Sequence, residues 1–363
     1  MSSLLRFMVV MTTSASGYQA AYVTKRAYSI FSRPRHPSPA RNTLTTASSL
    51  CSHQGGSCLC STKRDLNDVL RIAENAARKA GEIMRDTSGK IDVLKQKSSA
   101  RDIVTASDIA CQETINDIIR KEYPTDRFLG EESVGIGTGA SVDALQQALD
   151  SCDSGDSLLW IVDPIDGTTN FQAGLPVFCA SIGVVAPDKE VVVAAVYNPI
   201  LDEMVTAIRG NGCFVNGRKI DTSESKPINI QDSIINVGFP VSKVETLMAS
   251  SRATKALSLK VKGLRMFACA SQVMSWVAQR KLNAYISWDL NSWDICAGLL
   301  LVNEAGGFVS DFNGTEATVE TREMLISCQG ANDNMTDVDG NEKMPMHMEV
   351  LKILEEAECL ESY

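Results

Sequence analysis

Two carboxylates, Asp163 and Asp166, stand three residues apart directly after the apolar run at 158–162. The apolar run predicts a buried strand, and the Gly-Thr-Thr-Asn segment at 167–170 predicts a turn and a helix start. Carboxylate oxygens bind hard divalent cations, and the N–H groups at a helix start bind phosphate oxygens. The spacing therefore indicates metal-assisted chemistry on a phosphate group.

Further acids occur where apolar runs end or helices begin: Glu131 with Glu132, Asp102 with Asp108, and Asp294. Taken singly, each is more often a helix cap or a solvated surface group than a ligand. Carboxylates that meet at one rim of a layered sheet repel one another unless cations neutralise them. Oxygen ligands select Mg²⁺ or Mn²⁺ over zinc, and metal-assisted hydrolysis needs no histidine base. The only histidine after residue 53 is His347, which fits this chemistry.

Eleven cysteines raise the alternative of a zinc or disulfide protein. The chain contains no CxxC pair and only three histidines, so no zinc motif is recognisable. The cysteines after residue 64 are scattered and mostly in apolar context, which predicts small core side chains. Redox control of these thiols stays open.

The pattern of apolar residues predicts the elements that must position the acids. Helical periodicity predicts helices over 65–86, 107–122, 268–281 and 294–304, and a short one over 142–150. Strand patterns cover 158–162, 179–186, 190–197, 203–208 and 283–287, with another strand beginning at 308. Runs of strands with helices between them predict layered α/β sheets around one core. We expect one catalytic domain over 65–363, two subdomains divided near residue 210, and a polar insertion loop over 328–346.

Residues 1–64 contain eight Lys or Arg and no Asp or Glu, and they are rich in Ser and Thr. This composition is typical of an organelle transit peptide, with a disordered arm as the alternative. We expect a chloroplast address, with the mitochondrion as the alternative. Without these eight bases, 27 of the 35 Lys and Arg remain against 44 acids, a net charge near −17. Such a charge argues against nucleic acid and anionic membranes as partners, and no apolar run is long enough to span a membrane.

Four segments in order resemble the characteristic segments of the inositol monophosphatase family: Lys97–Asp108, Gly130–Ser133, Trp160–Phe171 and Ser292–Gly307. The resemblance extends from about residue 66 to 327, and with the N-terminal segment the chain looks like a plastid member from plants or algae. It implies a layered α-β-α-β-α sugar-phosphatase fold and dependence on Mg²⁺, with Mn²⁺ as a possible substitute. It also implies inhibition by lithium and a homodimer.

The resemblance assigns residues to metal ions as follows: Glu131, Asp163 and the Ile165 carbonyl to the first, Asp163, Asp166 and Asp294 to the second, and Glu132 to a third, weaker site. Among the catalytic residues it counts Glu131, together with Thr168, which would hold the attacking water, and Asp108, which would accept the Thr168 proton. Phosphate oxygens would meet the N–H groups of Gly167 and Thr168. Lys97 and Asp102 match supporting positions near the substrate.

The residues that would face the alcohol part of the substrate depart from the animal members of the family. Their Gly-Ser/Thr-Ala stretch is Ala268-Cys269-Ala270 here, and their inositol-binding glutamate is Ser287. Asp289 follows two residues later and could replace that glutamate. With Asp166 and Asp294, these positions complete the expected substrate contacts. Because a site that hydrogen-bonds hydroxyls discriminates strongly, the changes can alter substrate choice.

The sequence therefore predicts a metal-dependent phosphomonoesterase that acts on inositol 1-phosphate, a small-molecule phosphate monoester. The alternative substrates are galactose 1-phosphate, histidinol phosphate, fructose 1,6-bisphosphate and 3′-phosphoadenosine 5′-phosphate. A non-catalytic scaffold that keeps the fold is the alternative of another class. Retention of every metal-binding position argues against a scaffold, since nothing structural requires mutually repelling carboxylates.

Overall fold

The computed structural model describes residues 64–90, 93–96, 103–151, 157–222, 226–240, 243–329, 335–336 and 342–360. All of them belong to one compact unit. The predicted targeting segment up to residue 63 lies outside the described residues, as do Lys97, Asp102 and parts of the predicted 328–346 loop. Within the described chain, no helix has the length and apolarity needed to cross a membrane.

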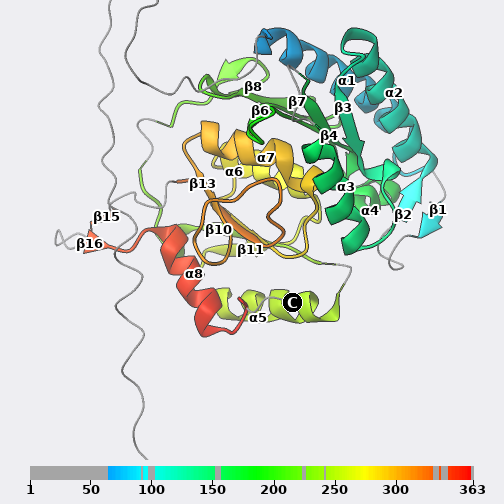
Figure 1. Cartoon of the computed structure of the whole chain (residues 1–363). Coiled ribbons are helices and arrows are strands. Elements are labelled where there is room, and N and C mark those ends of the chain that lie inside the picture. Colours follow the sequence, from blue (N-terminus) through cyan, green and yellow to red (C-terminus); the bar gives the residue numbers. More distant parts are fainter. Residues whose placement is uncertain are drawn as a thin grey trace, which may run out of the picture. The chain divides into compact units, whose positions relative to one another are not determined.

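The larger sheet has seven strands in the described chain, which follow one another in sequence order (Figure 1). They are β3 (Arg127–Gly130), β4 (Leu159–Asp166), β5 (Cys179–Val185), β6 (Val191–Asn198), β7 (Glu203–Ile208), β8 (Gly212–Val215) and β9 (Arg218–Lys219). Only β3 and β4 pair in parallel; the remaining neighbours are antiparallel. Strands β4 to β7 are buried along their whole length, so both faces of the sheet must be covered.

Two long helices, α1 (Leu66–Thr87) and α2 (Ala106–Glu122), cover one face of this sheet. Trp160 and Val162 of β4 pack with these helices, whereas Leu159 and Ile161 belong to the core on the opposite face. This alternation is the period-two pattern of a strand that is buried on both sides. A shift of one residue in the pairing would exchange the two faces, so the register is strongly specified.

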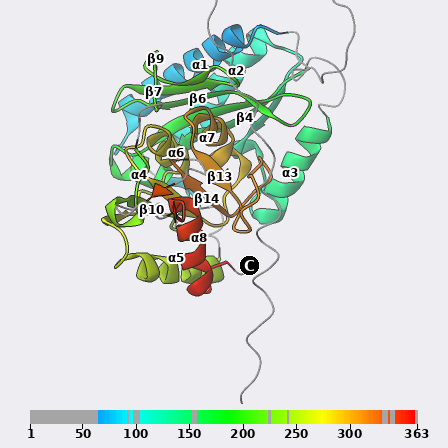
Figure 2. The same ribbon diagram turned by 90° about the vertical axis from the view of Figure 1, so that its left-hand side faces the viewer.

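The smaller sheet has five strands in the described residues, in the order β11-β10-β12-β14-β13. They are β10 (Ile234–Val237), β11 (Gly263–Arg265), β12 (Ala284–Ser287), β13 (Phe308–Ser310) and β14 (Met324–Ser327). Helices α6 (Ala270–Ala278) and α7 (Ser292–Glu304) pack between the two sheets, and α5 (Val244–Leu257) and α8 (Met346–Glu356) cover the outer face. Figure 2 shows the resulting order of layers, α-β-α-β-α, which is the predicted architecture.

The remaining elements are short: β1 (Val93–Gln96) with β2 (Ile103–Thr105), η1 (Glu131–Ser133), α3 (Thr138–Asp150), α4 (Thr168–Ala173), η2 (Ile230–Asp232), and β15 (Met335–Thr336) with β16 (Glu342–Lys343). Several sequence-based boundaries were wrong, and the predicted 268–281 helix spans only Ala270–Ala278. The predicted 142–150 helix begins at Thr138, and the predicted 294–304 helix begins at Ser292, directly after the capping residue Asn291. The predicted 158–162 strand continues to Asp166, because pairing with β5 resumes beyond Pro164.

Candidate active site

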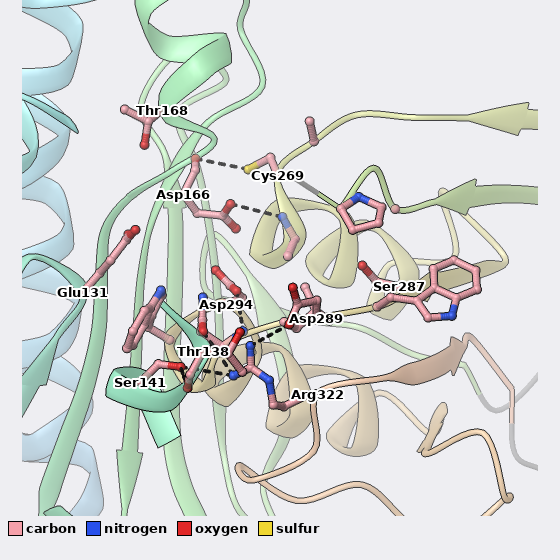
Figure 3. A pocket seen from close by; sticks show the side chains of 18 of the residues that line it. Glu131, Thr138, Ser141, Asp166, Thr168, Cys269, Ser287, Asp289, Asp294 and Arg322 are labelled. Atoms are coloured by element: carbon pink, nitrogen blue, oxygen red, sulfur yellow. Dashed lines mark hydrogen bonds and ion pairs between the residues drawn. The ribbon is translucent and has the colours of Figure 1, made fainter. Parts of the chain in front are cut away.

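Four carboxylates, those of Glu131, Asp163, Asp166 and Asp294, come together at the rim between β3, β4 and α7. Glu131, Asp166 and Asp294 line a cavity of about 280 Å³, and Figure 3 shows these three facing the same space. Asp163 lies behind them, 2% exposed, and interacts electrostatically with all three. The structure thus brings together residues that are separated by up to 163 positions in the sequence.

The parallel pairing of β3 with β4 explains why Glu131 meets Asp163. Gly130 stands opposite Val162 as the last pair of the parallel register, and the residue that follows each of them is an acid. In a regular strand, residues three apart point to opposite faces. The pairing of β4 with β5 is irregular between Asp163 and Asp166, where Pro164 provides no N–H to the sheet, and this irregularity returns both acids to one side.

Asp294 is placed by the capping of α7. It is the third residue of the helix, and its Oδ2 accepts the N–H of Asn291 at 2.7 Å in a capping box. Asp166 is held from the other side, where its Oδ1 accepts the Ala270 N–H at 3.1 Å and its Oδ2 accepts the Ser271 N–H at 2.5 Å. The backbone at Ala270 and Ser271 therefore positions a predicted metal ligand, and Ala270 also lines the cavity.

Burial and nearby negative charge raise the pKa of three of these acids, Asp163, Asp166 and Asp294. Burial, followed by the charges of Glu131 and Asp166, raises the pKa of Asp163 well above its usual value. Burial, followed by Asp166 and Glu131, does the same to the pKa of Asp294. Burial raises the pKa of Asp166 to about 6 against the opposing N–H donors of Ser271 and Ala270. An all-oxygen donor set that repels itself fits hard divalent cations, which would neutralise it.

A prediction on pH follows from these raised pKa values. In the metal-free protein, the folded state holds more protons than the unfolded chain between about pH 4 and pH 6, so stability falls as pH rises through this window. For Asp166 the loss is on the order of 3 kcal/mol. Protons also compete with a cation for the same oxygens. We expect Mg²⁺ to raise the unfolding temperature more at about pH 8 than at about pH 5. Thermal unfolding with and without a chelator measures this, and an equal rise at both pH values would contradict it.

A hydroxyl and a further acid lie next to the metal-ligand candidates. The Thr168 Oγ1 is 3.3 Å from Asp108 Oδ1 and 3.1 Å from the Ile165 carbonyl oxygen. Asp108 is 1% exposed, and its Oδ2 accepts both the N–H of Thr105 at 2.8 Å and the Thr105 hydroxyl at 2.5 Å. These bonds fix Asp108, so its other oxygen faces Thr168. The hydroxyl can donate its proton to Asp108 or Ile165 and accept a hydrogen bond from a water in the cavity.

The turn between β4 and α4 needs glycine. Gly167 has φ 88°, in the left-handed region, and a Cβ there would lie 2.9 Å from the Val177 carbonyl oxygen. Gly167, Thr168 and Thr169 all line the cavity, so backbone from the start of α4 borders the carboxylates. This is the place predicted for the phosphate group.

The predicted alcohol-binding residues also border the cavity. Ala268, Cys269, Ala270, Ser287 and Asp289 all line it. Asp289 forms ion pairs with Arg322 at 3.0 Å and with Lys243 at 3.7 Å. Asp289 therefore lines the same cavity as Ser287, and the side chains of Lys243 and Arg322 lie beside it.

Arg322 is a cavity residue that sequence reasoning missed. Besides Asp289, it donates to Ser141 Oγ and Asn291 Oδ1, each at 3.2 Å, and so ties α3 to the start of α7. No motif or spacing marks this arginine, because its partners are remote in sequence. Glu132, predicted for a third metal, shares η1 with Glu131 but is not among the cavity-lining residues of the described chain.

Comparison with known proteins places this arrangement in a family. The model of the inositol monophosphatase family matches residues 65–341. A Nus factor SuhB from Pseudomonas aeruginosa is 35% identical over 70% of this chain and 89% of its own length. An inositol monophosphatase 2 from Solanum lycopersicum is 34% identical over 72% of this chain and 94% of its own. The structure of a Thermotoga maritima IMPase superimposes with a TM-score of 0.64 at 31% identity, covering 80% of this chain and 98% of that one.

Proposed function

Because this chain belongs to the inositol monophosphatase family, a family of metal-dependent phosphomonoesterases, we propose that it hydrolyses inositol 1-phosphate to inositol and orthophosphate with Mg²⁺. The observation that carries the proposal is the meeting of Glu131, Asp163, Asp166 and Asp294 beside the Thr168–Asp108 pair. Retention of all these groups in or next to one cavity supports a catalytic role.

The donor set supports Mg²⁺, with Mn²⁺ as a substitute. Glu131, Asp163 and the Ile165 carbonyl would hold one ion, and Asp163, Asp166 and Asp294 a second. Bound cations of this kind supply water of lowered pKa and stabilise charge on the phosphate and on the leaving oxygen. Carboxylate and carbonyl oxygens suit these hard ions.

The chain's own groups would orient the reactants. Thr168 would accept a hydrogen bond from the attacking water while its own O–H donates to Asp108, which is fixed by Thr105. Backbone N–H groups of Gly167 and Thr168 would bind phosphate oxygens. Positioning of this kind converts the attack into an effectively unimolecular step.

The substrate is the finer part of the proposal. We expect the purified protein with Mg²⁺ to release phosphate from inositol 1-phosphate with a higher kcat/KM than from the other candidates: galactose 1-phosphate, histidinol phosphate, fructose 1,6-bisphosphate and 3′-phosphoadenosine 5′-phosphate. A steady-state panel, with and without lithium, measures the ranking. Inositol phosphates in last place would overturn the substrate, and no phosphate release from any compound would overturn the reaction.

Galactose 1-phosphate is the second candidate, because Ser287 stands where the family's inositol-binding glutamate is expected and Asp289 is paired with cations. A pocket that cannot bind the inositol hydroxyls through that glutamate can prefer a pyranose. The same panel separates the two substrates. A scaffold without catalysis would differ from both, because calorimetry would then find no binding of Mg²⁺ or Mn²⁺.

A further inference from the structure

Two buried thiols, those of Cys179 and Cys269, lie next to Asp166. Cys179 is opposite Asp166 in the pairing of β5 with β4, and Cys269 immediately precedes α6. Their sulfur atoms are 3.9 Å apart. The Cys269 Sγ is 3.3 Å from the Asp166 carbonyl oxygen, and Figure 3 draws this interaction. Three ligand atoms, one carboxylate oxygen and the two sulfurs, lie within 4.8 Å of one another.

The sulfur–sulfur distance fits a tetrahedral cation better than a disulfide. With Zn–S bonds of about 2.3 Å and a Zn–O bond of about 2.0 Å, a tetrahedral centre has S···S edges of about 3.8 Å and S···O edges of about 3.5 Å. The 3.9 Å separation of Cys179 and Cys269 matches the first value. A disulfide would require the sulfurs to approach to about 2.05 Å. The backbone therefore already holds the thiols at the spacing of a metal centre.

A cation can approach two of the three ligands from the cavity. Asp166 and Cys269 line the cavity, while Cys179 is fully buried behind them. A cation entering the cavity would reach the carboxylate and one sulfur first. The acids Asp163 and Asp294, which interact with Asp166, add negative potential that attracts any divalent cation.

We propose that Asp166, Cys179 and Cys269 form a binding site for a thiophilic divalent cation of the zinc and cadmium class, and that its occupation inhibits the enzyme. Thiolates select soft or borderline cations, whereas Mg²⁺ prefers oxygen. Binding transfers the two thiol protons to solvent and joins both sulfurs to the cation. The expected inhibition rests on the proposed function, because the thiophilic cation would take Asp166 away from the Mg²⁺ site. Binding of the thiophilic cation does not depend on the proposed function.

The binding experiment uses Cd²⁺ as the probe and the thiolate-to-metal charge-transfer absorption as the readout. In the parent chain, serine replaces the cysteines outside the described residues: Cys51, Cys58, Cys60 and Cys152. The full-length parent is titrated without Mg²⁺ in a phosphine reductant. We expect one Cd²⁺ with two thiolates per chain, and a loss of affinity of about 10²-fold in Cys179→Ala. The matched control Cys213→Ala removes a fully buried free thiol of β8 and should bind Cd²⁺ as the parent does.

The activity experiment separates this site from the proposed function. Phosphate release with Mg²⁺ should be inhibited by Cd²⁺ in the parent and in Cys213→Ala, and Cys179→Ala should need at least about tenfold more Cd²⁺ for the same inhibition. An inactive parent that still shows the two-thiolate absorption band would contradict the proposed hydrolysis and support the cation site. An active parent without the band, or a band unchanged in Cys179→Ala, would overturn the site.

A measurement without substitution at the site covers the case in which Cys179→Ala fails to fold. X-ray absorption of the zinc-loaded parent should show two sulfur neighbours at about 2.3 Å and oxygen at about 2.0 Å. Fewer than two sulfur neighbours would overturn the proposal whatever the behaviour of the variant.

Discussion

Replacement of Asp163 with asparagine is expected to lower kcat for phosphate release by about 10³-fold or more, the largest effect of any single substitution. Asp163 is the one acid assigned to both cations. Its residue is 2% exposed, and its carboxylate interacts electrostatically with the other three acids of the site. Asparagine keeps the volume and one oxygen but removes the charge. Because the loss concerns the reacting groups, kcat should fall far more than KM changes.

The same substitution should stabilise the metal-free protein. The carboxylate of Asp163 is buried among other carboxylates, and this burial and repulsion destabilise the folded state at neutral pH. Removal of that charge is expected to raise the unfolding temperature without metal and to abolish most of the rise that Mg²⁺ causes. Asp188→Asn, in an exposed turn, is the matched control and should change neither activity nor stability. Activity of Asp163→Asn within tenfold of the parent would remove Asp163 from its bridging role.

The parts of the site that lie at strand ends and helix starts could be predicted from the sequence. Glu131, Asp163 and Asp294 each follow or open an element with a clear apolar pattern, and the parallel β3–β4 pair makes two of those ends adjacent. The seven buried cysteines that the structure describes also confirm the prediction of small core residues. Local patterns predict such features because the same short segment contains both the element and the functional residue.

Other parts of the fold carry no local signal of this strength. Helix α5 was not predicted, because its buried face consists mainly of small residues such as Thr246, Ala249 and Ala253. Strands β10, β11 and β14 have three or four residues each and acquire their order only by pairing across the smaller sheet. Strand existence at this length is decided by tertiary contacts and not by propensity.

The wall that faces the substrate was the least predictable part of the site. The Arg322–Asp289 pair joins residues 33 positions apart, and the fixation of Asp166 by Ser271 depends on backbone N–H groups that leave no trace in residue identity. Backbone donors and long-range ion pairs are properties of the assembled structure. Substrate choice therefore needs the panel experiment, whereas the metal chemistry could be inferred from the four acids.

Replacement of Thr168 with valine is expected to lower kcat by about 10²-fold, with KM changed little. Valine keeps the shape of the side chain but removes the hydroxyl that lies 3.3 Å from Asp108 and 3.1 Å from the Ile165 carbonyl. Thr168→Ser is the matched control, since it keeps the hydroxyl and should retain activity within about threefold. Equal losses in the valine and serine variants would show that packing of the methyl group, and not the hydroxyl, matters.

A double substitution tests whether Thr168 and Asp108 act as one unit. If Asp108 serves only to accept the hydrogen bond of the Thr168 hydroxyl, Asp108→Asn should reduce kcat in the parent. In the Thr168→Val background it should then lower kcat by less than about a further threefold. Because Asp108 also binds Thr105, its variant must be compared by thermal unfolding so that loss of folded protein is not read as loss of catalysis. Fully multiplicative losses would mean that Asp108 contributes by another route, such as the rigidity of the α2 start, and that Thr168 orients the attacking water without its help.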